Sequence, residues 1–138
     1  MTSNEIAAGE GRIIELDAPR ALTAEEQALL DLLAAAGPPE LAAQARDALV
    51  VAECDCGCPS IGLATHAPVI PAAVVRGHPR YQHQGQLVVR AEGTDPAGND
   101  VEVTLHVLQG TITELEVWTG SYRQSPLPEP ASLRLDPT

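Results

Sequence analysis

The hydrophobic pattern of this chain changes its period once, near Val50. Before that point the apolar residues recur at the spacing of amphipathic helices, and after it they alternate with polar residues as in strands. A chain with helices first and strands afterwards predicts an α+β domain rather than alternating βαβ units. We therefore expect an N-terminal helical hairpin packed on one face of a four- to six-stranded antiparallel meander sheet.

Both helices are indicated by residues typical of helix ends. Thr23, with Glu26 three residues later, forms a capping box. Gly37 and the prolines after it are expected to end the first helix. The second helix is expected to begin at Pro39 or Glu40, because proline is tolerated in the first helical turn.

The 138 residues fit one domain with one core. We expect a disordered tail over residues 1–11, a single α+β domain over 12–123 and a Pro-rich extended tail without regular structure over 124–138. Residues 67–85 form a long irregular connection, which is typical of a functional or mobile segment. The chain begins without an apolar run, so neither a signal peptide nor a membrane span is expected, and a cytoplasmic location is predicted.

The strand register follows from which face must be apolar. A two-residue Gln109-Gly110 turn would set Leu105 opposite Glu114 and mix the two faces. A three-residue loop, Leu108-Gln109-Gly110, sets Leu105 opposite Thr113 and is therefore predicted. The predicted core consists of aliphatic residues: Leu29, Leu30, Leu33, Leu41, Leu49, Val51, Ile61, Leu63, Val89, Val101, Val103, Leu105, Leu115 and Val117.

The charge of the chain is strongly acidic. It contains 19 acidic residues against eight arginines, which gives a formal net charge of -11. Such a field repels phosphate backbones and anionic lipids, so no nucleic acid and no membrane is expected as a partner. It favours encounter with a protein that has a basic surface.

All three cysteines lie within five residues, in Cys54-Asp55-Cys56-Gly57-Cys58-Pro59-Ser60. A three-residue loop Asp55-Cys56-Gly57 would set Cys54 opposite Cys58 in a tight hairpin, with Gly57 at the left-handed position.

Three interpretations of these thiols stay open. Thiolates at Cys54, Cys56 and Cys58 could bind Zn, with a histidine as fourth ligand, His66 being nearest in sequence and His78 or His83 alternatives. A Cys54–Cys58 disulfide could act as a redox switch, although thiols are mostly reduced in the cytoplasm. The thiols could also simply be small apolar groups in a turn.

The polar face of the predicted meander is the second candidate region. We expect Glu102 opposite Glu116, with Arg90 pairing on the other side of Glu102, and Thr104 facing Glu114. The candidate partner-binding residues of this face and of the 67–85 segment are Trp118, Glu102, Glu114, Glu116, His106 and Tyr81. Carboxylates near a histidine can perform acid–base chemistry, but a solvated sheet face has the same composition, and a lone exposed tryptophan is typical of an interface.

The cysteine segment, followed by Leu115-Glu116 and the Pro-rich end, resembles small uncharacterised bacterial proteins with a Cys-Gly-Cys-Pro hairpin before a strand meander. The resemblance covers roughly residues 48–130, and it implies the hairpin and a single domain. It implies no activity.

No catalytic constellation is recognisable in the sequence, so a binding role is favoured and an enzyme of unrecognised class is only the third hypothesis. The charge and size predict a small binding or accessory protein of the inhibitor or immunity kind. The alternative is a Zn or redox-thiol site at the cysteine hairpin. The sequence predicts no oligomeric state.

Overall fold

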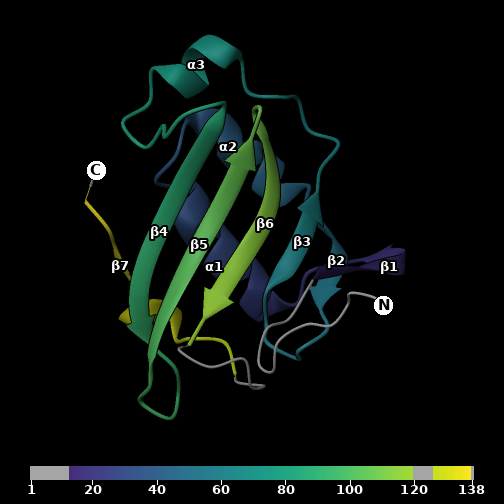
Figure 1. Cartoon of the computed structure of the whole chain (residues 1–138), viewed down its shortest axis with the longest axis vertical. Helices are drawn as coiled ribbons and strands as arrows, with labels where there is room; N and C mark the ends of the chain where they lie inside the picture. The colour runs from purple at the N-terminus through teal and green to yellow at the C-terminus, as the bar shows by residue number, and fades with distance from the viewer. Residues whose placement is uncertain (1–12, 120–125, 138) are drawn as a thin grey trace, which may run out of the picture.

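The computed structural model describes residues 13–119 and 126–137, and its architecture is α+β (Figure 1). The helices are α1 (Ala24–Ala34), α2 (Pro39–Arg46), α3 (Ala72–Arg76) and the 3-10 helix η1 (Pro130–Ser132). The strands are β1 (Ile13–Arg20), β2 (Leu49–Cys54), β3 (Ile61–Ala64), β4 (Gln86–Thr94), β5 (Asp100–Leu108), β6 (Thr111–Trp118) and β7 (Arg134–Leu135). The predicted tail over residues 1–11 lies outside the described residues.

The strands form one seven-stranded sheet in the order β1-β2-β3-β6-β5-β4-β7, and every neighbouring pair is antiparallel. The α+β class is thus confirmed, but the expected four to six strands are too few, and the helices follow β1 rather than opening the fold. The sheet is also more than a meander, because β3 pairs with β6 and joins the β1–β3 half to the β4–β6 half.

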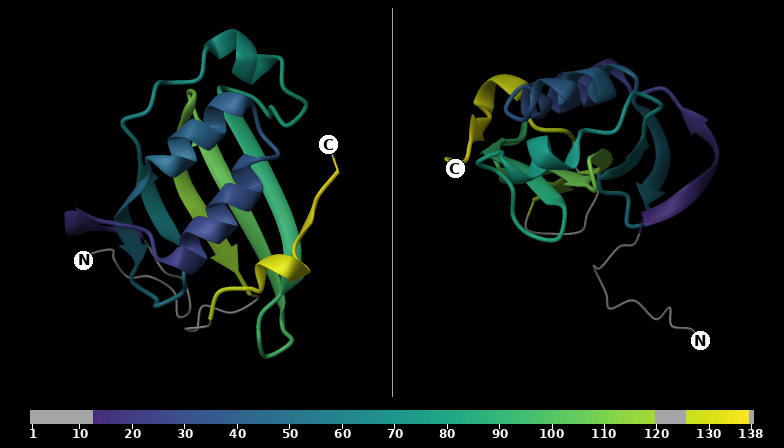
Figure 2. Two further views of the ribbon diagram at one scale, coloured as in Figure 1. Left: turned by 180° about the vertical axis from the view of Figure 1, so that it is seen from behind. Right: turned by 90° about the horizontal axis from the view of Figure 1, so that it is seen from above.

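Helices α1 and α2 contact each other and lie on one face of the sheet (Figure 2). α1 packs on β4 and β5, and α2 packs on β6. The opposite face of β4, β5 and β6 is not covered by any described helix, as the front of Figure 1 shows. No described helix is long and apolar enough to cross a membrane.

The capping box that the sequence predicts begins α1. The backbone N–H of Glu26 donates to Thr23 Oγ1 at 3.1 Å, and the N–H of Thr23 donates to Glu26 Oε1 at 2.9 Å. The helix ends at Ala34, before Gly37, because the chain then tightens into bonds that span three residues instead of four. The N–H of Ala36 donates to the Leu33 carbonyl and the N–H of Gly37 donates to the Ala34 carbonyl. α2 begins at Pro39, as predicted.

The core lies between these helices and the sheet, and most of the predicted core residues belong to it. The prediction is wrong in β2, where Val50 is fully buried and its neighbours Leu49 and Val51 are half-buried. The physical reason is a register shift between Val50 and Ala52, which changes the face that the residues present.

The turn between β5 and β6 differs from the predicted three-residue loop. Leu108 pairs with Thr111, so the loop has two residues, and Gln109 and Gly110 take φ values of 53° and 80°, as a type I′ turn requires. A bulge between His106 and Val107 then shifts the register and sets Leu105 opposite Leu115. The apolar face is therefore kept by the bulge and not by the loop length.

The predicted absence of regular structure after residue 124 is wrong for residues 130–135. This segment forms η1 and β7, and β7 pairs Leu135 with Ala91 and Arg134 with Glu92. The C-terminal segment thereby adds a short strand at the edge of β4.

Candidate functional site

The cysteine segment folds back on itself, with glycine at the bend. Strand β2 ends at Cys54, and the N–H of Gly57 donates to the carbonyl of Cys54 at 3.3 Å, which closes a turn. Gly57 has a φ of 90°, in the region that residues with a Cβ rarely adopt. The chain then reaches β3 at Ile61.

The predicted register of this hairpin is wrong. The last pair between β2 and β3 is Glu53 with Ile61, so the loop is longer than three residues. Cys54 lies opposite Ile13 of β1 rather than opposite Cys58. The prediction assumed that pairing continues up to the turn, whereas the ladder stops one residue before the first cysteine.

The three sulfur atoms nevertheless converge. The Sγ atoms of Cys54, Cys56 and Cys58 all lie within 4.8 Å of one another, which is close enough to hold one metal ion. Cys54 Sγ and Cys56 Sγ are 3.0 Å apart, and the backbone N–H of Cys58 donates to Cys56 Sγ at 3.3 Å. All three are free thiols and half-buried.

The thiols differ in acidity because their surroundings differ. Burial, with a hydrogen bond to Cys56, raises the pKa of Cys54 well above its ordinary value. Burial also opposes ionisation of Cys58, but hydrogen bonds from the hydroxyl and backbone N–H of Ser60 lower the pKa of Cys58 overall. Cys58 is therefore the thiol that ionises more readily of the two.

Ser60 fixes the exit of this loop to the sheet. Its hydroxyl is buried and accepts a bond from the N–H of Val117 at 2.9 Å, while its single proton is shared between the Val117 carbonyl, at 3.2 Å, and the sulfur of Cys58. This side chain therefore replaces backbone pairing between the loop and β6. Sequence reasoning placed Ser60 in the motif but assigned it no role, since nothing in the sequence indicates which strand it would reach.

The histidines considered as a fourth ligand do not join the thiols. His66 follows the far end of β3, where its backbone N–H donates to Asp47 at 2.6 Å, and Asp47 precedes β2. His78 follows α3 and its Nδ1 accepts from the N–H of Arg80. Within residues 13–119 and 126–137, only the three cysteines form such a potential metal-binding group.

The open face of β4–β6 holds most of the predicted partner-binding residues, in a register that differs from the predicted one. Glu102 lies opposite Trp118 instead of Glu116, and Glu114 lies opposite His106. Arg90 lies opposite Thr104, and Glu92 instead takes the predicted place beside Glu102, but Arg90 Nε still reaches diagonally to within 3.9 Å of Glu102 Oε2.

His106 and two glutamates form the centre of this face. His106 Nε2 lies 2.8 Å from Glu116 Oε1. Burial raises the pKa of Glu114, the nearby charge of Glu116 raises it further, and His106 opposes both effects. Glu114 is thus a half-buried carboxylate whose ionisation the face disfavours.

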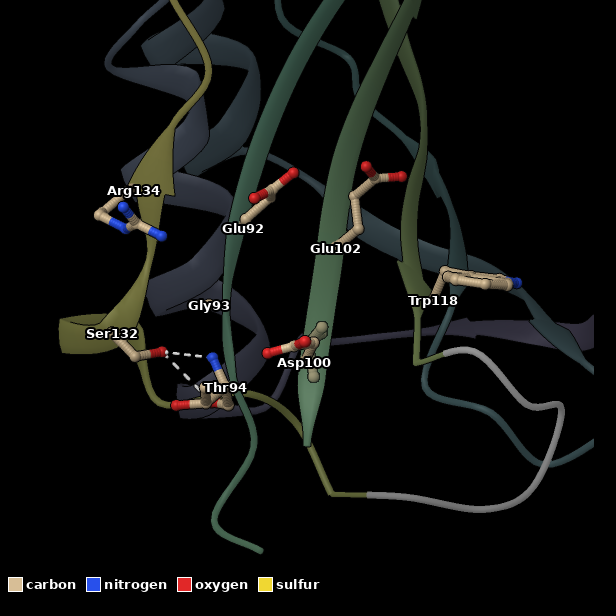
Figure 3. A pocket seen from close by; sticks show the side chains of 9 residues that line it. Glu92, Gly93, Thr94, Asp100, Glu102, Trp118, Ser132 and Arg134 are labelled. Carbon is tan, nitrogen blue, oxygen red and sulfur yellow. Dashed lines mark hydrogen bonds between the residues drawn. The ribbon is translucent and has the colours of Figure 1, made fainter. Parts of the chain in front are cut away.

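A cavity of about 480 Å³ lies at the lower end of the open face (Figure 3). Its lining includes Glu92, Asp100, Glu102, Trp118 and Arg134, contributed by four strands. Sequence reasoning missed Glu92, Asp100 and Arg134. The strand alternation of β4 would have identified Glu92, but Arg134 becomes part of the face only through β7, which was not predicted.

Tyr81 does not belong to this face. It forms an isolated bridge with Leu87 and packs against the core beside α3, half-buried. It lines a separate, smaller cavity with Val69, Ile70 and Val75. We therefore treat Tyr81 as a packing residue of the 67–85 connection.

The fold and these sites define an α+β protein with one helix-covered sheet face, one open acidic face and a three-thiol loop. Comparison with known proteins adds no family to this description: no family model, no curated protein and no solved structure matches the chain significantly.

Proposed function

We propose that the loop of Cys54, Cys56 and Cys58 binds a soft metal ion, with Zn²⁺ as the leading candidate. The observation that supports this is the convergence of three sulfur atoms within 4.8 Å of one another. With Zn–S bonds of about 2.3 Å, two sulfurs on one tetrahedral Zn²⁺ lie about 3.8 Å apart. The thiols can therefore reach this spacing by side-chain rotation within the loop.

The surrounding groups support thiolate ligands. The N–H groups of Cys58 and Ser60 point at sulfur atoms of the cluster, and such bonds stabilise sulfur-centred negative charge. A cation would also displace the proton that burial retains on Cys54, because metal binding and deprotonation are coupled.

Three ligands from one loop leave a fourth position for an exogenous ligand such as water or a small thiol. Zinc sites with three protein ligands and an open position are those that exchange or activate ligands, whereas purely structural sites are closed by four. The proposed role is therefore reversible metal binding rather than a fold-sustaining zinc knuckle.

The test uses protein purified without a metal-affinity tag, under reducing conditions. Native mass spectrometry after addition of Zn²⁺ should show one ion per chain, and Co²⁺ should give the near-ultraviolet absorption of thiolate-to-metal charge transfer. Cys56→Ser and Cys58→Ser should abolish both signals. His66→Ala is the matched control and should retain them, because His66 lies at the other end of β3.

Metal-free protein with three titratable thiols, which takes up neither Zn²⁺ nor Co²⁺, would overturn the proposal. Loss of metal in His66→Ala would overturn the assigned ligand set.

A redox role is the second candidate, favoured by the 3.0 Å separation of Cys54 Sγ and Cys56 Sγ. Two thiols would give two electrons and two protons to a small disulfide, which is reduced to two thiols while Cys54 and Cys56 become bonded. Peptide mapping after treatment with oxidised glutathione should find this linkage. Since the disulfide consumes two of the proposed ligands, oxidised protein should bind no Zn²⁺.

A further inference from the structure

The open face of β4, β5 and β6 differs from an ordinary solvated sheet surface in how its charges are arranged. Glu92 lies directly opposite Glu102, and directly opposed like charges destabilise a sheet. In the same row Arg134 lies opposite Glu92 and Trp118 lies opposite Glu102. Across β7, β4, β5 and β6, the row therefore consists of a cation, two carboxylates and an indole.

Among residues 13–119 and 126–137, most of the carboxylates on this face have no ion-pair partner. Of the face's described ion pairs, one joins Arg90 to Glu102 at 3.9 Å and the other joins His106 to Glu116 at 2.8 Å. The ion pairs of the described residues include none at Glu92, Asp100 or Glu114. These carboxylates without ion-pair partners do not stabilise the folded chain.

The same residues border a concave surface. Figure 3 shows Glu92, Glu102 and Asp100 around the cavity of about 480 Å³, with Arg134 at its β7 side and Trp118 at its β6 side. Trp118 is 46% exposed, and tryptophan is enriched among the residues that anchor interfaces. Shape, charge and aromatic surface thus coincide at one end of the face.

We infer that this face docks a basic segment of a partner protein, with an arginine or lysine side chain entering the cavity between Glu92 and Glu102. An arriving cation relieves the repulsion between the two carboxylates, and the indole of Trp118 covers the apolar part of the segment. Arg134 lies beyond Glu92 on the β7 side and keeps the cation from moving past Glu92. The net charge of -11 steers such a partner to the protein.

This inference gives the accessory or inhibitor-like role expected from the sequence a specific surface. It does not depend on the thiol loop, since none of the residues that line the cavity is a cysteine.

The experiment uses a fluorescently labelled octa-arginine peptide as the probe, with an octa-glutamate peptide and a DNA duplex as further arms. Anisotropy at low salt should show octa-arginine binding that weakens as NaCl is raised, and no binding in the other arms. Glu92→Gln with Glu102→Gln should raise the Kd about tenfold. Trp118→Ala should also raise it.

The matched control removes the same two charges from the helix-covered side. Glu25 and Asp31 are exposed on α1, so Glu25→Gln with Asp31→Asn changes the net charge equally. This control should change the Kd less than about twofold, since it alters only the long-range field. Circular dichroism verifies that both double variants are folded.

Equal weakening by both double variants would overturn the inference, because the attraction would then follow net charge alone. Absence of octa-arginine binding at low salt, or binding of the duplex, would overturn it as well. Cys56→Ser should bind the peptide like the wild type, so a failure here is distinguishable from a failure of the metal proposal.

Discussion

At the scale of single residues, Glu26 and Arg20 together connect three elements. It closes the capping box of α1 and accepts two bonds from the guanidinium of Arg20 in β1, at 2.9 and 3.0 Å. Arg20 in turn donates to Glu53 of β2 at 3.0 Å. One buried acid thus fixes the angle at which the chain leaves the edge strand and enters the first helix.

Glu26→Gln should lower the free energy of unfolding by about 1–2 kcal/mol at pH 7, because it removes charge-assisted bonds. Burial opposes the ionised form, but the bonds from Arg20 and Thr23 lower the pKa of Glu26 overall. A lowered folded pKa stabilises the protein above the ordinary value of 4.5, and this contribution is lost as the pH falls through the folded pKa.

When urea denaturation is repeated at pH 7, 5 and 3, the deficit of Glu26→Gln should therefore stay nearly constant down to pH 5 and shrink at pH 3. Glu25→Gln, in the same helical turn, provides the control, since it removes one charge without touching Arg20. A deficit that is the same at every pH would contradict the assigned pair.

At the scale of elements, Gln44 holds α2 to the end of the sheet. Its fully buried side chain donates to the carbonyls of Pro68 and Gly110, at 3.0 and 2.8 Å, and accepts from the N–H of Ile112 at 2.9 Å. It thereby satisfies backbone groups at the end of the β5–β6 turn, at the start of β6 and in the connection from β3 to α3.

Gln44→Leu should lower the free energy of unfolding by about 2–4 kcal/mol, because it keeps the volume but removes two buried bonds and leaves the buried N–H of Ile112 without its acceptor. Gln82→Ala, at an exposed glutamine, should change it by less than about 0.5 kcal/mol. Thermal denaturation of the two variants checks this. A small effect of Gln44→Leu would mean that water replaces the amide.

The elements whose ends carry local signals could be predicted from the sequence. Thr23 and Glu26 determine the start of α1 locally, and Pro39 does the same for α2. The register of the two hairpins could not be predicted. A bulge at Val51 or near Thr113 leaves one residue unpaired, and in return it keeps the apolar residues on one face despite a loop length that would otherwise mix the faces. The residue types alone do not distinguish a bulge from a longer loop.

The same reasoning separates what was predictable in the sites. Proximity of the three thiols follows from their spacing and from Gly57, so it could be predicted. Their partners could not, because Ser60 acts through β6, which is 57 residues away. The row from Arg134 to Trp118 likewise requires β7, whose pairing partner no local pattern indicates.

At the scale of the whole molecule, repulsion among the acidic side chains opposes folding. The chain carries 19 acidic residues against eight basic ones, and the face of β4–β6 concentrates several carboxylates. Compact folding brings these charges closer together than they are in the unfolded chain.

The Tm should therefore rise when NaCl is increased from about 10 to 150 mM, since the Debye length falls from about 30 to 8 Å. Glu92→Gln with Glu102→Gln should raise the Tm at low salt and reduce its salt dependence. Differential scanning calorimetry measures both effects. A Tm that falls with NaCl would show that attractive pairs such as Arg20–Glu26 outweigh the repulsion.

The bonds between Ser60 and Val117 have a practical consequence, because Val117 precedes the only tryptophan of the chain. Light at wavelengths longer than those that the two tyrosines absorb excites this indole alone. A rearrangement of the thiol loop that reaches β6 through Ser60 will alter the fluorescence emission of this indole. The unlabelled protein therefore carries a fluorescent reporter of metal binding or oxidation at its thiols.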